Sequence, residues 1–382
     1  MFDGPTAAID LDALAYNLAR LRAKLGPKTS VLAAVKADAY GHGLVEVSRA
    51  LAQLGVKWFG VATPEEAMAL RRAGVPGDIL LLGPLLHRSA VTELAEANVS
   101  LTVTDLTNLN LIRSADLPSG VKLQLKVDTG MGRLGLPPQR AVEVAREVSK
   151  DHRLELQGVW THLADSDDSD RTRTEQQIDD FETALDLLAK DGNLPPIRHA
   201  SNSAGIVAYP RAHYDLVRAG ICLYGYYPSE FISQVEPGLK PVMTLTAPVT
   251  FVKQIEAGTT LSYAGLWYSP ARTRIATVRI GYADGYPRSL TGKTWVNFGD
   301  EQLPVVGRIC MDQMLVDIGD SDVKVGDRVT LWGSDGPSAE YLAKSLGTVS
   351  YELLTGVGTR IARVYRRNEA ASRSGAGLLR SL

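Results

Sequence analysis

Cysteine is scarce in this chain, which has only two among its 382 residues, Cys222 and Cys310. Two cysteines do not make a disulfide framework, so we expect a reducing compartment and a cytoplasmic location. The opening residues show no basic region followed by a long apolar run, which argues against a signal peptide. No stretch approaches about 18 uninterrupted apolar residues, which argues against a membrane span.

An excess of charge of one sign is also missing. The formal net charge is −2, which gives no electrostatic reason to expect nucleic-acid binding. Hydrophobic residues make up 45% and charged residues 22% of the chain, and both values are ordinary for a soluble globular protein. The length of 382 residues is large for one domain and suits two.

What the sequence does contain is a regular alternation of strand and helix signals. After a helical pattern at residues 10–25, eight apolar runs each precede a helical pattern; the runs span 31–35, 58–62, 78–82, 99–103, 121–127, 154–162, 197–201 and 215–218. This alternation requires parallel strands joined by crossover helices, and eight units predict an α/β fold with a closed (β/α)8 barrel. A doubly wound open sheet is the alternative, although no glycine-rich dinucleotide fingerprint follows the first strand.

The pattern changes near Gly238. Short β-rich runs separated by turns follow one another at 242–251, 259–262, 274–280, 293–297, 303–306, 314–318 and 328–332, with one helix at 338–346. We therefore predict a barrel over residues 1–238 and a mostly-β domain over residues 239–369. The last residues, 370–382, are mostly small and polar, and we expect them to form a flexible tail.

The stretch VLAAVKADAYGHG at residues 31–43 carries the first candidate for chemistry. Its apolar run ends in Lys36, at the C-terminal end of a buried strand, where α/β folds place their functional groups. Burial would lower the pKa of this amine and make it a usable nucleophile or base. A lysine that simply returns to solvent is the commoner case, so the position alone leaves both interpretations open.

The string AVKADAYGHG resembles the cofactor-lysine motif of the alanine racemases, a family in which that lysine forms a Schiff base with pyridoxal 5′-phosphate (PLP). Further strings resemble the family in the same order: KVDTGMGRLG, WTHLADSDD, HASNSAG, YDLVRAGICLYG, LSYAGLWY, IGYADGYPR, GRICMDQ and SYELLTGVGTR. The resemblance covers about residues 6–366. It implies a PLP-binding barrel and a second domain that contributes to the active site of a partner subunit in a homodimer.

For the barrel, the resemblance implies that Lys36 is a catalytic base as well as the cofactor lysine. Arg133 would contact the substrate carboxylate, and Lys126 matches a lysine that is often carbamylated and then orients this arginine. His162 would lie near the cofactor ring and Arg218 would face its pyridine nitrogen. Because an arginine does not give up its proton, the ring would stay largely unprotonated. The other implied cofactor contacts are Tyr40, Asn202, Ser203, Gly220, Ile221 and Tyr351.

For the second domain, the resemblance implies a second base. A racemase removes a proton from one face of the α-carbon and returns one to the other face, which needs two bases on opposite sides. Tyr263 matches the family's second base, which is supplied across the dimer interface. Ala264 stands where a glycine often follows that tyrosine, so the local backbone is left open. Met311 would contact the substrate carboxylate through its amide, and the supporting residues implied are Tyr282, Arg288, Cys310 and Asp312.

Taken singly, some of these residues have ordinary explanations. Ser203 fits a plain helix cap as well as it fits a phosphate contact. His162, followed by aspartates at 165, 167 and 168, is a weak metal pattern, and we predict no metal site.

The sequence therefore predicts an isomerase that interconverts L-alanine and D-alanine with PLP and supplies D-alanine for peptidoglycan precursors. It would act as a homodimer on alanine, with no nucleic-acid or membrane partner. A broad-specificity or serine racemase of the same family is the first alternative. A non-catalytic PLP-binding protein is less favoured, because such proteins resemble the barrel alone and lack the domain that carries the tyrosine.

Overall fold

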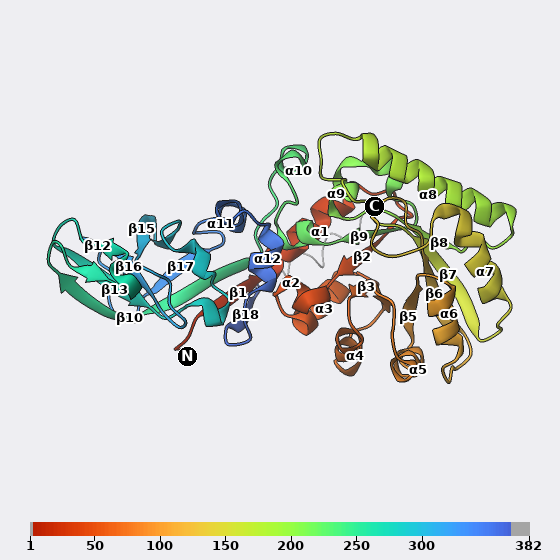
Figure 1. Ribbon diagram of the computed structural model, residues 1–382, viewed down its shortest axis with the longest axis horizontal. Helices are drawn as coiled ribbons and strands as arrows, with labels where there is room; N and C mark the ends of the chain where they lie inside the picture. The colour runs from red at the N-terminus through yellow and green to blue at the C-terminus, as the bar shows by residue number, and fades with distance from the viewer. Residues whose placement is uncertain (1–2, 368–382) are drawn as a thin grey trace, which may run out of the picture.

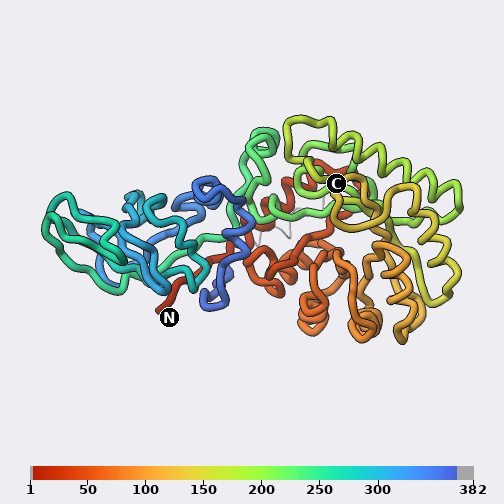
Figure 2. The backbone as a smooth tube through the Cα atoms, viewed as in Figure 1, coloured from red at the N-terminus to blue at the C-terminus, as the bar shows by residue number. Residues whose placement is uncertain are grey.

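The structure is a computed structural model that describes residues 3–367 (Figure 1). A barrel of parallel strands surrounded by helices forms one end of the molecule, and a β-rich domain forms the other. Figure 2 shows that the chain starts beside the β-rich domain, builds the barrel, and then returns. None of the helices within the described residues is long and apolar enough to cross a membrane.

The barrel strands are parallel and neighbour one another in the order β8-β7-β6-β5-β4-β3-β2-β9. The backbone N–H groups of Asp215 and Arg218 donate to the carbonyl oxygens of Arg198 (3.1 Å) and Ser201 (2.9 Å), which joins β9 to β8 and closes the ring. The predicted (β/α)8 barrel is therefore confirmed. Its strands are β2 (Ser30–Ala34), β3 (Trp58–Val61), β4 (Asp78–Leu81), β5 (Val99–Val103), β6 (Val121–Lys126), β7 (Leu154–Trp160), β8 (Ile197–His199) and β9 (Leu216–Ala219).

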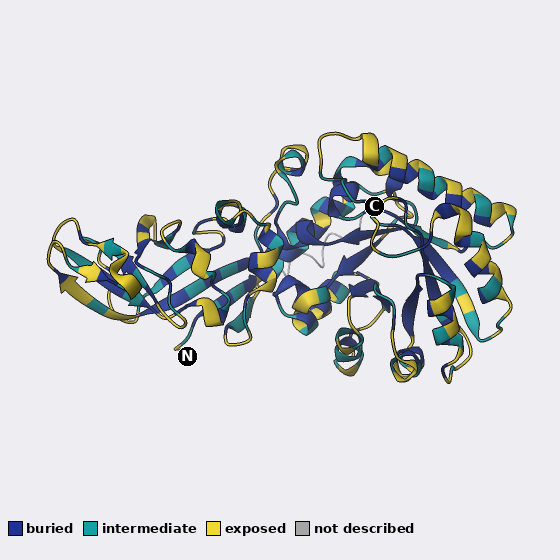
Figure 3. Ribbon diagram, viewed as in Figure 1, coloured by how far each residue is buried: buried dark blue, intermediate teal, exposed yellow. Residues whose placement is uncertain are grey.

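Helices cover the outside of the barrel, and local sequence signals set where several of them begin. Thr63 and Glu66 form a capping box around Pro64, the first residue of α4. The side chain of Asp105 accepts a hydrogen bond from the Asn108 N–H and caps α6. Figure 3 shows buried strands inside and helices exposed on their outer faces. The helices are α1 (Leu11–Arg22), α3 (Leu44–Gln53), α4 (Pro64–Arg72), α5 (Arg88–Glu96), α6 (Leu106–Arg113), α7 (Ala141–Ser149), α8 (Thr172–Lys190) and α9 (Ser203–Ala208).

The interior of the barrel is divided into an apolar side and a polar side. Leu32, Trp58, Leu80 and Leu216, from β2, β3, β4 and β9, form a buried cluster separate from the main core. The strands β5 to β8 instead bury polar side chains, namely Ser100, Thr102, Gln124, Lys126, Gln157 and His199. Alternate residues of a barrel strand point inward, so polar residues on this side face the space beneath the mouth of the barrel.

The second domain is built mainly from antiparallel strands. Its sheet has the order β13-β16-β15-β14-β17-β10-β1-β18, and an added pairing of β13 with β10 closes six of these strands into a small barrel. The long strand β10 (Met243–Ile255) pairs with three neighbours. The other strands are β13 (Thr273–Val278), β14 (Trp295–Phe298), β15 (Glu301–Val306), β16 (Met314–Asp317), β17 (Arg328–Trp332), β18 (Ala362–Arg366) and β1 (Thr6–Asp10).

Two terminal strands were not predicted. The strand β1 pairs antiparallel with β10 and parallel with β18, so residues 6–10 lie in the second sheet and not in the barrel. Each strand has only five residues, and its partners lie far away along the chain, so neither carries a strong local signal. The predicted domain boundary between residues 238 and 239 stays a proposal, amended by the finding that β1 belongs to the sheet of the second domain. The expected tail at 370–382 lies outside the described residues.

Candidate active site

A cavity of about 520 Å³ opens at the C-terminal ends of the barrel strands. A volume in this range suits a small cofactor together with a small substrate. Among the residues singled out in the sequence, those that line the cavity are Lys36, Tyr40, Lys126, Arg133, His162, Asn202, Ser203, Arg218, Gly220, Ile221 and Tyr351. Tyr351 belongs to α12 (Ser350–Thr355), and the others come from the barrel. The fold thus gathers in one place groups that are up to about 300 positions apart in the sequence.

The chain directly after Lys36 makes a left-handed turn that was not predicted. Residues 37–40 all have φ between 53° and 55°, a region that costs L-residues about 1–2 kcal/mol each. Glu66 on α4 stabilises the turn, because its Oε1 accepts a hydrogen bond from the Ala37 N–H at 2.6 Å. The turn folds the chain back, so that Lys36 and Tyr40 line the same cavity.

Burial and neighbouring cations tune the amine of Lys36. Desolvation lowers its pKa, and the positive charge of Arg133 lowers it further, while the carboxylate of Glu66 acts in the opposite direction. A lowered pKa increases the fraction of neutral amine, which is the form that attacks a carbonyl or takes up a proton. The location of Lys36 therefore supports chemistry and not a simple return to solvent.

Arg218, at the centre of the site, is held without a carboxylate partner among the described residues. Its Nη2 donates to the carbonyl oxygens of Thr161 and Ala200, both at 2.7 Å, and lies 3.3 Å from His162 Nδ1. Its Nη1 lies 3.0 Å from His199 Nδ1. A guanidinium only donates, so both imidazoles accept through Nδ1 and carry their proton on Nε2. Burial, followed by the charge of Arg218, holds the pKa of both histidines well below the usual value, so both are neutral.

A buried relay beneath Arg218 was missed in the sequence. The Nε2–H of His199 donates to Gln124 Oε1 at 2.9 Å, and Gln124 Nε2 donates to Gln157 Oε1 at 3.0 Å. Ser100 Oγ also donates to Gln157 Oε1, at 2.8 Å. The relay fixes the tautomer of His199 and hence the acceptor that faces Arg218. A polar residue alternating with apolar ones in the run 121–127 was the only available signal for it.

Lys126 and Arg133 lie on the polar side of the cavity. Lys126 Nζ donates to the Val127 carbonyl oxygen at 2.6 Å and lies 4.9 Å from the centre of the Trp160 ring. Burial, together with the charge of Arg218, lowers the pKa of Lys126 to about 7. The neutral form of this amine is therefore far more accessible than it is for a lysine in solvent. Arg133 is exposed where it lines the cavity, so its guanidinium is available to a ligand.

Phenol, hydroxyl and amide groups gather at another part of the cavity. Ser203 Oγ accepts hydrogen bonds from the N–H groups of Gly220 (2.9 Å) and Cys222 (3.3 Å). A Cβ on Gly220 would lie 2.9 Å from the hydroxyl of Tyr40, so only glycine allows this close approach. The ring of Tyr351 lies 6.0 Å from that of Tyr40, and burial raises the pKa of both phenols, which stay protonated donors.

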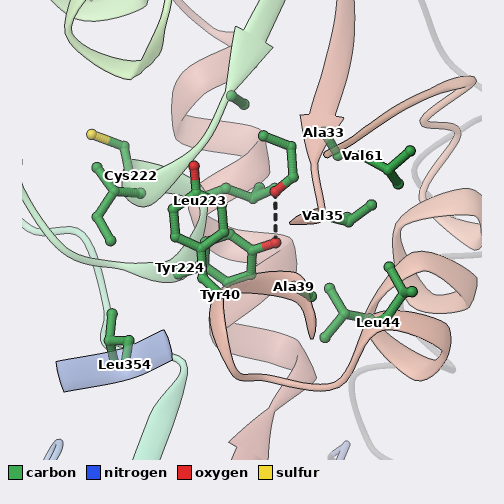
Figure 4. Packing of buried hydrophobic residues seen from close by; sticks show 14 of the residues in the cluster. Ala33, Val35, Ala39, Tyr40, Leu44, Val61, Cys222, Leu223, Tyr224 and Leu354 are labelled. Carbon is green, nitrogen blue, oxygen red and sulfur yellow. Dashed lines mark hydrogen bonds between the residues drawn. The ribbon is translucent and has the colours of Figure 1, made fainter. Parts of the chain in front are cut away.

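Two details of this region refine the expectations. The cap of α9 is Asn202, whose side chain accepts from the Gly205 N–H at 2.9 Å, so Ser203 is not the cap. Tyr40 stacks on Tyr224, and Leu354 of α12 packs beside the two rings (Figure 4). The helix that carries Tyr351 is thus packed against the main core near Tyr40.

The remaining predicted residues do not line the cavity; they are Tyr263, Tyr282, Arg288, Cys310, Met311 and Asp312. Tyr263 lies between β11 (Thr260–Leu261) and β12 (Trp267–Tyr268), a ribbon at the end of the molecule farthest from the barrel (Figure 1). The side chains of Tyr263 and Met311 are 69% and 53% exposed. Within one chain, therefore, these groups are separated from the cavity.

The acidic loop after β7 does not assemble a metal site. Asp165 pairs with Arg173 at 2.6 Å, and Asp167 lines the cavity, where burial raises its pKa. Within residues 3–367, no group of three or more His, Cys, Asp or Glu side chains is arranged to hold a metal ion. Asp167 is a cavity residue that the sequence analysis named only as part of this weak metal pattern.

Comparison with known proteins gives concordant results over both domains. The family description "Alanine racemase, N-terminal domain" matches residues 9–228, and "Alanine racemase, C-terminal domain" matches residues 242–365. An alanine racemase from Methanococcus maripaludis is 41% identical over 366 residues, covering 94% of this chain and 98% of the relative.

Solved structures agree. The alanine racemase of Clostridium difficile 630 superposes with a TM-score of 0.91 at 36% identity, covering 96% of this chain and 97% of that chain. The alanine racemase of Bacillus anthracis, solved with bound L-Ala-P, has a TM-score of 0.91 at 33% identity, with 96% of each chain covered.

Proposed function

The chain belongs to the alanine racemase family, and we propose that it is a PLP-dependent isomerase that interconverts L-alanine and D-alanine. The observation that carries the proposal is the content of one cavity. It combines a lysine whose pKa is lowered, an arginine without an acid partner among the described residues, and a cluster of phenol and hydroxyl donors. Few other chemistries need all three groups together.

The residues present fit PLP. Lys36 supplies the amine for the covalent link, and Tyr40, Ser203, Ile221 and Tyr351 supply donors for a phosphate. Gly220, whose N–H is bonded to Ser203 Oγ, lines the same part of the cavity. The hydrogen bonds of Arg218 among the described residues use only its two terminal nitrogens, which leaves Nε–H for a ring nitrogen. When bound, PLP supplies an electron sink that stabilises negative charge at the substrate α-carbon.

Two bases then move the proton. Lys36 takes or returns it on one face of the substrate, and Tyr263 of a second copy acts on the other face. A tyrosine starts near pKa 10, so its phenolate needs stabilisation. His162 is suited to this, because its Nδ1 accepts from Arg218 and its Nε2–H is left to donate to a phenolate oxygen. Arg133 holds the substrate carboxylate, and a carbamate on Lys126 would orient Arg133.

A homodimer follows from this division of the site. Tyr263 lies on a ribbon far from the barrel of its own chain, and the same ribbon exposes further apolar residues, Leu266 (56% exposed) and Tyr268 (67% exposed). A second copy would cover this surface and receive the tyrosine. In the cell we propose a cytoplasmic role, in which the product D-alanine enters peptidoglycan precursors.

The test uses purified protein, PLP and L-alanine. We expect D-alanine to appear, as measured by chiral chromatography, and borohydride reduction followed by peptide mass spectrometry to place the cofactor on Lys36. A panel of L-amino acids that includes serine distinguishes a narrow alanine racemase from a broad-specificity one. Bound cofactor without any D-alanine would refute the proposed activity.

A further inference from the structure

We propose that Ser262 is a positioning residue that fixes the backbone of the second base, Tyr263, by locking it to the segment after β15. The inference rests on the proposed function, because it gives Tyr263 its role. It concerns residues of a single chain, so it does not depend on how two copies pack together.

The backbone around Tyr263 is strained on both sides. Ser262 has φ 65° and ψ −175°, a region that is essentially restricted to glycine, and Ala264 has φ 62°. The side chain of Tyr263 is 69% exposed and has no hydrogen-bond partner within residues 3–367. No side-chain hydrogen bond among the described residues therefore directs Tyr263, and its direction depends strongly on the backbone of residues 262–264.

A reciprocal pair of hydrogen bonds holds this backbone. Ser262 Oγ donates to the carbonyl oxygen of Arg308 at 3.0 Å and accepts from the Arg308 N–H at 3.1 Å. The hydroxyl thus pairs with both the backbone N–H and the backbone carbonyl of Arg308, the two groups that an adjacent β-strand would bond. Because β15 belongs to the closed sheet, this contact ties the short β11–β12 ribbon to the rigid part of the domain.

Gly307 makes this contact possible. A Cβ on Gly307, which has φ 66°, would lie 2.7 Å from Ser262 Cβ, closer than packed carbon atoms approach. Cys310 Sγ lies 3.8 Å from Ser262 Oγ and lines the same small hollow as Ser262 and Tyr263. A glycine at position 262 would adopt this backbone without strain but would lack the hydroxyl, so the serine accepts backbone strain and gains the two hydrogen bonds to Arg308.

The first measurement needs no cofactor. In the cofactor-free protein, amide hydrogen exchange at Arg308 should accelerate at least tenfold in both Ser262→Ala and Ser262→Gly, since each removes the acceptor of that N–H. Ser149→Ala is the matched control, because Ser149 Oγ bonds only within its own helix at 2.8 Å. Unchanged protection of Arg308 in the two Ser262 variants would contradict the contact itself.

The second measurement separates positioning from general destabilisation. The two alanine enantiomers are equally stable, so kcat/KM must stay equal in both directions and is uninformative about one base. Exchange of the α-proton with deuterated water, followed by NMR for each enantiomer, reports the two bases separately. In both Ser262 variants we expect exchange of one enantiomer to fall at least tenfold and exchange of the other to stay within about twofold, with the cofactor absorbance unchanged.

Equal loss for both enantiomers, or no loss for either, would overturn the proposal. The Ser262→Gly variant keeps the test valid if Ser262→Ala folds poorly, because glycine adopts this backbone without strain. Failure of the proposed function gives a different result, in which the parent protein itself neither racemises alanine nor exchanges its α-proton.

Discussion

The two proposed bases lie in opposite surroundings. Lys36 lies in a cavity where burial and Arg133 tune its pKa and Glu66 holds the turn that follows it. Tyr263 lies on an exposed ribbon, where its neighbour Ser262 is hydrogen-bonded to Arg308 but its own side chain has no hydrogen-bond partner among the described residues. The pKa of Lys36 is thus tuned by residues of its own chain. The orientation of Tyr263 is set by its own chain, but the groups that would tune its pKa belong to a second copy.

This contrast predicts how substitutions in each region should affect stability and activity. Changes in the barrel should disturb a network of mutually dependent groups, and stability and chemistry should respond together. Changes in the ribbon should leave the barrel intact and affect only what a second copy receives. The following predictions test this difference.

The largest effect should come from mixing two inactive variants. Lys36→Ala and Tyr263→Phe should each reduce racemisation by at least about 10²-fold, because each removes one of two bases. A hybrid dimer would contain one site with the intact Lys36 of one chain and the intact Tyr263 of the other. After co-expression with two different tags and purification of the hybrid, we expect activity to return to roughly half that of the parent.

The control for this experiment is a hybrid of two differently tagged Tyr263→Phe chains, which should stay inactive. If the Lys36→Ala and Tyr263→Phe hybrid also stays inactive, the two bases act within one chain and the contrast between the regions is wrong.

A second prediction concerns the buried amine of Lys126. Its folded-state pKa of about 7 lies below the usual value of 10.5, so the unfolded chain binds more protons between these values. The free energy of unfolding of the parent should therefore rise with pH from about 7 to about 10.5. Below pH 7 the amine is charged in both states, and the folded protein bears the full cost of burying that charge. Lys126→Met removes the titration and should be more stable than the parent by roughly 3–5 kcal/mol at pH 6, with the gain shrinking as the pH rises.

Urea unfolding in bicarbonate-free buffer measures this gain, with Lys122→Met on the same strand as the matched control. The sign is decisive: a Lys126→Met protein that is less stable than the parent at pH 6 would mean that the amine is favourably paired when charged.

The relay beneath Arg218 should give a smaller change. Gln124→Leu leaves the Nε2–H of His199 buried without an acceptor, and the other tautomer would present a proton to Arg218. We expect a loss of about 1–3 kcal/mol in unfolding free energy and a clear reduction of kcat. Gln176→Leu, at an exposed glutamine on α8, should change stability by no more than about 0.5 kcal/mol. Equal stability of the two variants would show that the relay is not needed.

The fold of the barrel and the residues of its cavity could largely be predicted from the sequence, whereas the buried relay could not. The barrel could be predicted because its signals are local: buried parallel strands form apolar runs, and caps such as Thr63 and Asp105 mark helix starts. The cavity residues could be predicted because short motifs carry them. The relay through Gln124 and Gln157 could not, since a buried glutamine and an exposed one look alike in the sequence.

The unusual backbone conformations and the terminal strand pairings also could not be predicted from the sequence. The turn at residues 37–40 uses non-glycine residues in the left-handed region and is held by Glu66, more than twenty positions away. The strand β1 is stabilised by β10 and β18, which both lie more than 200 positions further along the chain. In both cases the stabilising partner is distant in the sequence, so the local sequence pattern does not predict the conformation.

The smallest expected effect concerns Ala264, where the sequence departs from a family glycine and left the backbone open. The structure has the left-handed conformation there, with φ 62°, which is a conformation that glycine adopts more easily than alanine. Ala264→Gly should therefore relieve strain and raise the unfolding free energy by up to about 1 kcal/mol, since the gain is reduced by the greater freedom of glycine in the unfolded chain. Because Ser262 still holds Arg308, α-proton exchange of both enantiomers should change by less than about threefold. A larger loss, confined to one enantiomer, would show that Ala264 shares with Ser262 the task of aiming the tyrosine, and that the ribbon tolerates less freedom than its exposure suggests.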